Sequence, residues 1–184
     1  MILILKRTKE NLVMKNCSKG MVPFLTKEEI SELVKSIATQ IKSQHGNEAL
    51  HLVCPLKGSI IFVADLAREF QDTEVTIDFV KVKSKGEGFI VDKDIETDIR
   101  GKSVIIVEEI IDAGRTLAFL KNHLTLSLPK SVEIACLLDK PARRETPVAP
   151  DYTGKTIDDR FVIGYGMDSD ELGRNCQDIY NFLQ

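Results

Sequence analysis

The clearest pattern along the chain is a run between residues 26 and 45 in which apolar residues recur every three or four positions. Thr26 and Glu29 fit a capping box, in which each side chain accepts a hydrogen bond from the backbone N–H of the other residue, and Gly46 suits the end of the helix. The run therefore predicts an amphipathic helix whose role is packing. The residues on its apolar face are Ile30, Leu33, Val34, Ile37, Ala38 and Ile41.

Further along the chain, short apolar runs alternate with helical patterns. The runs predict strands near residues 50–54, 75–82, 103–107, 132–138 and 161–165, and the helical patterns lie near 60–70 and 115–126. This alternation predicts the α/β class, with a mostly parallel sheet covered by helices on both faces. Ligands of such sheets bind beyond the carboxyl ends of the strands. Chemistry is therefore expected in the loops that begin at Pro55, Lys83, Glu108 and Asp139.

Composition narrows the class of protein. The chain has 184 residues, of which 43% are hydrophobic, so we expect a single domain over residues 1–184. A formal net charge of -3 argues against a protein that grips nucleic acid, so the expected partner is a small molecule. No secretion signal and no apolar run of about 18 residues is visible, which predicts a cytoplasmic protein that does not bind membranes.

The cysteines suggest the same compartment. They are far apart and form no CxxC pair, so neither a zinc site nor a disulfide framework is expected. We expect free thiols in a reducing environment at Cys17, Cys54, Cys136 and Cys176.

The most informative segment is VIIVEEIIDAGRTL, residues 104–117. Its Gly-containing turn, followed by a helix, offers backbone N–H groups and a helix N-terminus to a phosphate, and the hydroxyl of Thr116 can add a donor. The carboxylates of Glu108 and Glu109 suit sugar hydroxyls or a metal ion instead. The whole segment therefore predicts a ligand that carries both a phosphate and a polyol, such as a phosphorylated ribose.

This segment resembles the phosphoribosyl pyrophosphate motif of the type I phosphoribosyltransferases, and in particular of their hypoxanthine-guanine branch. Three further segments resemble the same branch and occur in its order: the Leu56–Ser59 loop, LLDKPARR at 137–144 and DRFVIGYGMD at 159–168. The resemblance implies Mg²⁺-dependent transfer of phosphoribose from phosphoribosyl pyrophosphate to hypoxanthine or guanine. The products would be IMP or GMP and pyrophosphate.

The resemblance also implies roles for individual residues. Asp112 would act as general base, taking a proton from the purine. Phosphoribose would be held by Glu108, Glu109, Asp112, Ala113, Gly114, Arg115 and Thr116. Pyrophosphate would be held by Lys57, Gly58 and Arg174, and the bond between Leu56 and Lys57 can be cis in similar enzymes.

For the purine, the resemblance implies stacking on Phe161, reading of its edge by backbone groups around Val162 and Asp168, and donation from Lys140 to the 6-oxo oxygen. Asp168 would also bind the Mg²⁺. A lysine ammonium carries only donors, so we expect adenine, which presents an amino group at this position, to be a poor substrate.

Two residues depart from the family pattern. The second acid of the motif is usually Asp but is Glu109 here, and the extra methylene must move its carboxylate relative to the ribose. The mobile loop of the family commonly carries Ser-Tyr, whereas this chain has Ser84 and Lys85. Closure of that loop over the reacting centre would therefore use the charge of Lys85 or other residues.

The fold that the resemblance implies is a central, mostly parallel sheet with a small hood formed by the N-terminal residues and about 140–184, assembled as a homodimer or homotetramer. Two alternatives remain at this point: a transferase that prefers xanthine, and a nucleotide-sensing regulator on the same fold. A regulator that had lost catalysis could dispense with Asp112 or with the Lys57–Gly58 loop. Both are present.

Overall fold

The computed structural model describes residues 23–86 and 88–181, and its centre is a six-stranded sheet with strand order β4-β3-β2-β5-β6-β7. Five strands run parallel, and only β4 pairs antiparallel with its neighbour β3. This confirms the expected mostly parallel sheet. The strands are β2 (Leu50–Pro55), β3 (Val75–Lys85), β4 (Gly88–Lys93), β5 (Ser103–Ile111), β6 (Ser131–Asp139) and β7 (Tyr152–Thr156).

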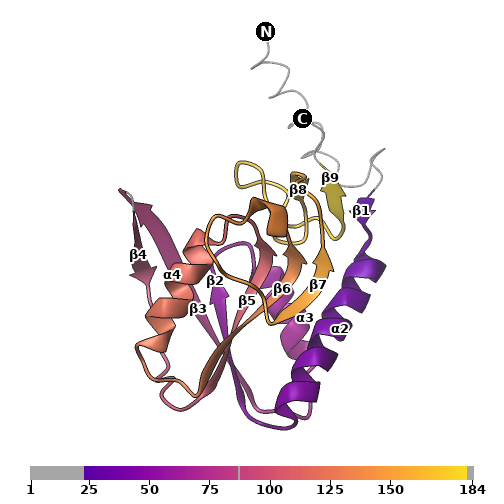
Figure 1. Ribbon diagram of the computed structural model, residues 1–184. Coiled ribbons are helices and arrows are strands. Elements are labelled where there is room, and N and C mark those ends of the chain that lie inside the picture. The colour runs from indigo at the N-terminus through magenta and orange to yellow at the C-terminus, as the bar shows by residue number, and fades with distance from the viewer. Residues whose placement is uncertain (1–22, 87, 182–184) are drawn as a thin grey trace.

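Helices cover both faces of this sheet, as expected (Figure 1). The successive residues of β5 point to opposite faces: Ile105 packs with α2 and α3, whereas Ile106 packs with α4. No helix within 23–86 and 88–181 is long and apolar enough to cross a membrane. The helices are α2 (Lys27–His45), α3 (Ile60–Arg68), α4 (Arg115–Thr125) and the short 3₁₀ helix η1 (Pro141–Arg143).

The helix α2 begins at the capping box that the sequence predicts. Thr26 accepts a hydrogen bond from the backbone N–H of Glu29, and the Glu29 carboxylate accepts one from the N–H of Thr26. Gly46 ends the helix with φ 59°, a backbone conformation that glycine adopts without steric cost. All but Leu33 of the predicted apolar face are fully buried, and Leu33 packs against the same core.

A second, three-stranded sheet lies above the carboxyl ends of the parallel strands (Figure 1). It consists of β1 (Pro23–Leu25), β9 (Ile179–Asn181) and β8 (Val162–Ile163), in that order and antiparallel. The strand predicted at 161–165 is thus reduced to two residues and belongs to this small sheet. Its apolar run is interrupted by Gly164, with φ 108°, and Tyr165, with φ 49°, which turn the backbone out of the strand.

The two edge strands of the main sheet were not predicted. In β4 every second residue is exposed, and β7, with the sequence YTGKT, buries only Tyr152 fully. Edge strands need fewer apolar residues, so their hydrophobic signal is weak. The prediction of a loop that begins at Lys83 is also wrong, because residues 83–85 extend β3 and pair with β4 in a hairpin.

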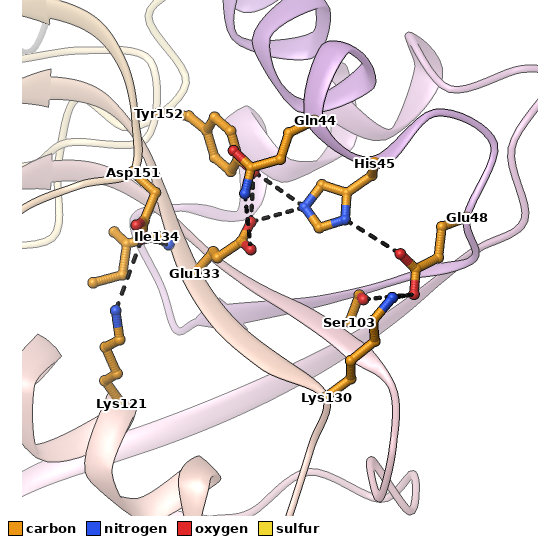
Figure 2. Close-up of polar contacts among 10 residues, drawn as sticks. All are labelled: Gln44, His45, Glu48, Ser103, Lys121, Lys130, Glu133, Ile134, Asp151 and Tyr152. Atoms are coloured by element: carbon orange, nitrogen blue, oxygen red, sulfur yellow. Dashed lines mark hydrogen bonds and ion pairs between the residues drawn. The ribbon is translucent and has the colours of Figure 1, made fainter.

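At the amino-terminal edge of the sheet, polar side chains tie the end of α2 to the strands (Figure 2). The Glu133 carboxylate contacts the Nε2 of His45 at 2.8 Å and accepts hydrogen bonds from Gln44 and the Tyr152 hydroxyl. Glu48 accepts hydrogen bonds from Ser103 and Lys130. None of the residues that make these contacts belongs to the predicted site.

The expectation of free thiols is correct for Cys54 and Cys136, which are buried, and wrong for Cys176, which is disulfide-bonded. Spacing along the chain does not reveal which cysteines the fold brings together, so the sequence could not show this bond. Cys17 lies outside the described residues.

Candidate active site

Two adjoining pockets open at the carboxyl ends of the parallel strands. The larger, of about 360 Å³, is lined by the turn from β5 into α4 together with Ser84, Phe89 and Glu108. The smaller, of about 160 Å³, is lined by Glu109, Lys140, Phe161, Val162, Met167 and Asp168. Ile110 and Asp112 line both pockets. A ligand with two parts could therefore occupy both and meet Asp112 at their junction.

The floor of the larger pocket is the turn formed by residues 112–114 and the first turn of α4. Gly114 has φ 79°, and a Cβ there would lie 2.5 Å from Val148 and 2.9 Å from Arg144, so only glycine fits. The first N–H groups of a helix have no partner within it. Arg115, Thr116 and Leu117 line the pocket at this position, so the pocket meets the N-terminus of α4, as the predicted phosphate site requires.

Glu108 and Glu109, expected to act together on a sugar, point into different pockets because adjacent residues of a strand face opposite sides. Both lie within β5 rather than in a loop after it. Burial raises the pKa of Glu108, and the neighbouring Glu109 raises it further. Its buried Oε2 has no hydrogen-bond partner within the described residues. Such an atom needs a donor, and sugar hydroxyls are suitable donors.

Glu109 reaches the loop at Gly58. A Cβ on Gly58 would lie 1.8 Å from Oε1 of Glu109, and a Cβ on Gly166 would lie 2.0 Å from the carbonyl oxygen of Gly58. The extra methylene of Glu109 thus fills space against this loop. Burial raises the pKa of Glu109 to about 7, and Asp168 raises it while Arg174 lowers it.

The loop that carries Lys57 packs beside the 164–174 segment. The peptide bond between Leu56 and Lys57 is cis, as the resemblance implies. Lys57 pairs with Glu171 at 2.9 Å. Arg174 pairs with Asp168 at 2.8 Å and donates to the carbonyl oxygen of Gly166. The structure thus brings the three residues assigned to pyrophosphate together with Asp168, although they are distant in the sequence.

Asp112 lies among cations. Its carboxylate accepts a hydrogen bond from Nε of Arg143 at 3.0 Å and lies 3.8 Å from the Nζ of Lys140. Lys140 is only 5% exposed and lines the smaller pocket, so its ammonium faces this pocket and not bulk solvent. Arg143 and the adjacent Arg144 were not singled out from the sequence. The signal for them was a doublet of arginines that begins four residues after the end of a buried strand.

Phe161 lies just before β8 and is 41% exposed, in contrast to its buried neighbour Val162. An aromatic ring that lines a pocket while half-exposed suits stacking on a flat ligand. The structure therefore separates Phe161 from the core, to which a residue in an apolar run would ordinarily belong.

The hairpin of β3 and β4 forms one wall of the larger pocket. Ser84 lines the pocket, whereas Lys85 pairs with Gly88 at the end of the strand and does not line it. Phe89 lines the wall as well, and its ring lies 5.7 Å from the Arg115 guanidinium and 5.6 Å from the Phe119 ring. Phe89 was missed because an aromatic residue in a short apolar run resembles any other strand residue.

Comparison with known proteins agrees with this geometry. The family model for the phosphoribosyl transferase domain matches residues 24–170 of this chain. A hypoxanthine phosphoribosyltransferase of Salmonella typhimurium is 43% identical over 162 residues, covering 84% of this chain and 89% of the relative. A hypoxanthine-guanine phosphoribosyltransferase of Aquifex aeolicus is 37% identical over 164 residues, covering 85% and 92%.

Solved structures show the same fold. A hypoxanthine-guanine phosphoribosyltransferase of Bacillus anthracis superposes with a TM-score of 0.85 at 39% identity, covering 88% of this chain and 98% of that one. The hypoxanthine phosphoribosyltransferase of Trypanosoma cruzi, in complex with the product IMP, superposes with a TM-score of 0.83 at 33% identity, covering 88% and 93%.

Proposed function

The chain belongs to the phosphoribosyltransferase family, and from this membership we propose that it transfers 5-phosphoribose from phosphoribosyl pyrophosphate to hypoxanthine or guanine in purine salvage. The products are IMP or GMP and pyrophosphate. The observation that carries the proposal is the pair of pockets that meet at Asp112, one with an anion-binding turn and the other with an exposed aromatic ring beside a buried lysine. The curated relatives named for hypoxanthine support this substrate over xanthine.

The larger pocket takes the ribose 5-phosphate. The N–H groups of Ala113, Gly114 and Arg115 and the hydroxyl of Thr116 surround the phosphate. Glu108 accepts hydrogen bonds from the ribose hydroxyls, which satisfies its buried Oε2. Glu109 lies on the other side of β5, where its carboxylate packs against the pyrophosphate loop at Gly58.

The smaller pocket takes the purine. The purine ring stacks on Phe161, the edge of the purine contacts the backbone at Val162 and Asp168, and the 6-oxo oxygen accepts a hydrogen bond from Lys140. The depth of Lys140 makes this a discriminating contact, because a buried ammonium that faces another donor is costly.

The reaction joins a ring nitrogen of the purine to the anomeric carbon of ribose, while the bond from that carbon to pyrophosphate breaks and pyrophosphate leaves with the electron pair. Asp112 takes the proton from the purine N–H as the bond forms. In the structure its Oδ1 accepts a hydrogen bond from Arg143 and its Oδ2 lies 3.8 Å from the Nζ of Lys140. A carboxylate has several lone pairs, so Asp112 can accept the purine N–H while Arg143 holds it in place. The β3–β4 hairpin, which lines the larger pocket through Ser84 and Phe89, covers the centre and excludes water.

Lys57, the amides at Gly58 and Arg174 stabilise the charge on the departing pyrophosphate. Lys57 and Arg174 exchange their present carboxylate partners, Glu171 and Asp168, for phosphate oxygens. Within residues 23–86 and 88–181 no three His, Cys, Asp or Glu side chains could hold a metal by themselves. The carboxylates of Asp168 and Glu109 are nevertheless the hard oxygen donors that Mg²⁺ prefers, and Mg²⁺ commonly takes its remaining ligands from phosphates and water. When bound, Mg²⁺ supplies positive charge to the leaving group.

The small sheet β1-β9-β8 serves as the hood over this site. It joins an N-terminal segment to segments after residue 160, whereas β7, within the range 140–184, belongs to the main sheet. The hood supplies the pocket wall at Val162.

A single assay tests the function. We expect pyrophosphate release from phosphoribosyl pyrophosphate with Mg²⁺ and hypoxanthine or guanine, and far less with xanthine or adenine. Release with none of the four bases, alongside binding of IMP, would instead indicate a nucleotide-sensing protein. Preference for xanthine would contradict the assignment of the smaller pocket.

A further inference from the structure

Three consecutive carbonyl oxygens of the turn before α4 accept hydrogen bonds from one segment, residues 140–145. The carbonyl of Ile111 accepts from the N–H of Lys140 at 3.0 Å, and that of Ala113 accepts from the N–H of Glu145 at 3.0 Å. Between them, the carbonyl of Asp112 accepts from Nη1 of Arg144. Arg144 therefore provides the one side-chain donor in this series.

The position of Arg144 is built on its other side too. Its Nη2 pairs with the carboxylate of Asp139, at the end of β6, and both side chains are almost buried, with 13% and 11% exposure. Its Cδ lies against Gly114, where a Cβ would come within 2.9 Å. The guanidinium thus joins the end of β6 to the turn, and its stem limits the space behind Gly114.

The orientation of these carbonyls decides where the N–H groups of the turn point. The carbonyls of 111–113 are directed at the 140–145 segment, so the peptide N–H groups between them point to the opposite side. That side is the larger pocket, which the same turn lines.

We propose that Arg144 is a positioning residue for the phosphate of the substrate, acting through the backbone of Asp112 rather than by contact with the ligand. This inference rests on the proposed function for the identity of the ligand. Arginine suits the role because its planar fork can bond a carboxylate and a carbonyl at once, whereas a lysine ammonium cannot span both in that geometry. The segment that reads the purine through Lys140 thereby also holds the phosphate turn.

The test separates the two ends of phosphoribosyl pyrophosphate. Ribose 5-phosphate and pyrophosphate are titrated separately, with Mg²⁺ present, into the wild type and into Arg144→Lys, which keeps a cation beside Asp139. We expect Arg144→Lys to weaken binding of ribose 5-phosphate by about tenfold or more, the usual worth of a hydrogen bond from a charged group, and to leave pyrophosphate binding unchanged. The matched control is Arg68→Lys in an exposed ion pair at the end of α3, which should change neither.

A loss of global stability would weaken both ligands equally, and equal losses or no loss would overturn the proposal. If Arg144→Lys unfolds, the double variant Arg144→Met with Asp139→Leu removes both buried charges and must show the same selective loss. The titrations need no turnover. A wild type that binds ribose 5-phosphate but makes no IMP would therefore contradict the proposed function and leave the role of Arg144 to be decided by the variants.

Discussion

At the scale of single residues, Asp112 is held in an unusual position for a surface carboxylate, since Arg143 and Lys140 both approach it. As the proposed base it must be ionised and must accept a proton from the purine. Replacing it with Asn keeps the size of the side chain and removes the basic oxygen. We expect Asp112→Asn to lower kcat by roughly 10² to 10⁴ fold, the usual range for a positioned base.

Steady-state kinetics and thermal unfolding together check this prediction. Asp159→Asn is the matched control, because Asp159 is the other carboxylate near Nε of Arg143, at 3.7 Å. It should keep a nearly normal rate. Unchanged turnover in Asp112→Asn, with a normal Tm, would remove Asp112 from the role of base.

Lys140 is the residue to which we assign base selectivity. Its ammonium is buried at the smaller pocket and offers donors only, so adenine would place an amino donor against it. That mismatch costs roughly 2 to 3 kcal/mol or more, enough to decide selectivity. Lys140→Gln can present an amide oxygen instead. The ratio of kcat/KM for hypoxanthine over adenine should be large in the wild type and smaller in the variant.

The fall in that ratio should come mainly from poorer use of hypoxanthine. A ratio near one in the wild type, or a ratio that the substitution does not move, means that Lys140 does not read the 6-position.

At the scale of elements, the anchoring of α2 shows how the scaffold is held apart from the chemistry. His45, in the last turn of α2, is 7% exposed and contacts Glu133 of β6 at 2.8 Å and the Tyr152 hydroxyl of β7 at 3.1 Å (Figure 2). His45→Ala would leave the nearly buried Glu133 without this partner. We expect a loss of about 1 to 3 kcal/mol in the free energy of unfolding, with a normal KM for both substrates.

Urea denaturation measures this loss. Lys121→Ala, which removes a partly exposed ion pair 3.8 Å long to Asp151 near the same strands, should cost less than about 1 kcal/mol. If the two variants lose the same stability, the His45 contacts do not anchor the helix.

At the scale of the whole molecule, burial of the two carboxylates of the site makes the stability of the folded protein depend on pH. The pKa of Glu109 rises from 4.5 to about 7 in the folded protein because the carboxylate is buried, and burial raises the pKa of Glu108 in the same direction. Between pH 4.5 and 7, the ordinary and the folded-state pKa of Glu109, the folded state binds more protons than the unfolded state. The free energy of unfolding therefore falls as pH rises through this interval. The metal-free wild type should lose on the order of 1 to 3 kcal/mol over this interval through Glu109.

Denaturation of the metal-free protein at pH 5 and pH 7.5 tests this dependence. Glu109→Gln should flatten it and be the more stable protein at pH 7.5, with a remaining slope from Glu108. Glu32→Gln, at an exposed position on α2, should follow the wild type. A steeper fall in Glu109→Gln would reverse the assigned sign.

The sequence by itself determined the layered α/β class and the capped helix α2, and it singled out the four segments that the structure brings together, because periodicity, capping and ordered motifs are local properties of the chain. It did not reveal the edge strands β4 and β7, whose burial depends on one neighbour, nor the hairpin in place of the expected loop. Only the tertiary structure decided that Glu108 and Glu109 serve different pockets and that Gly58 packs against Glu109. It likewise placed Arg144 behind the turn before α4, 32 residues from Asp112 in the chain. Such contacts join distant segments, and no local pattern encodes the distance between residues that meet only when the sheet is assembled.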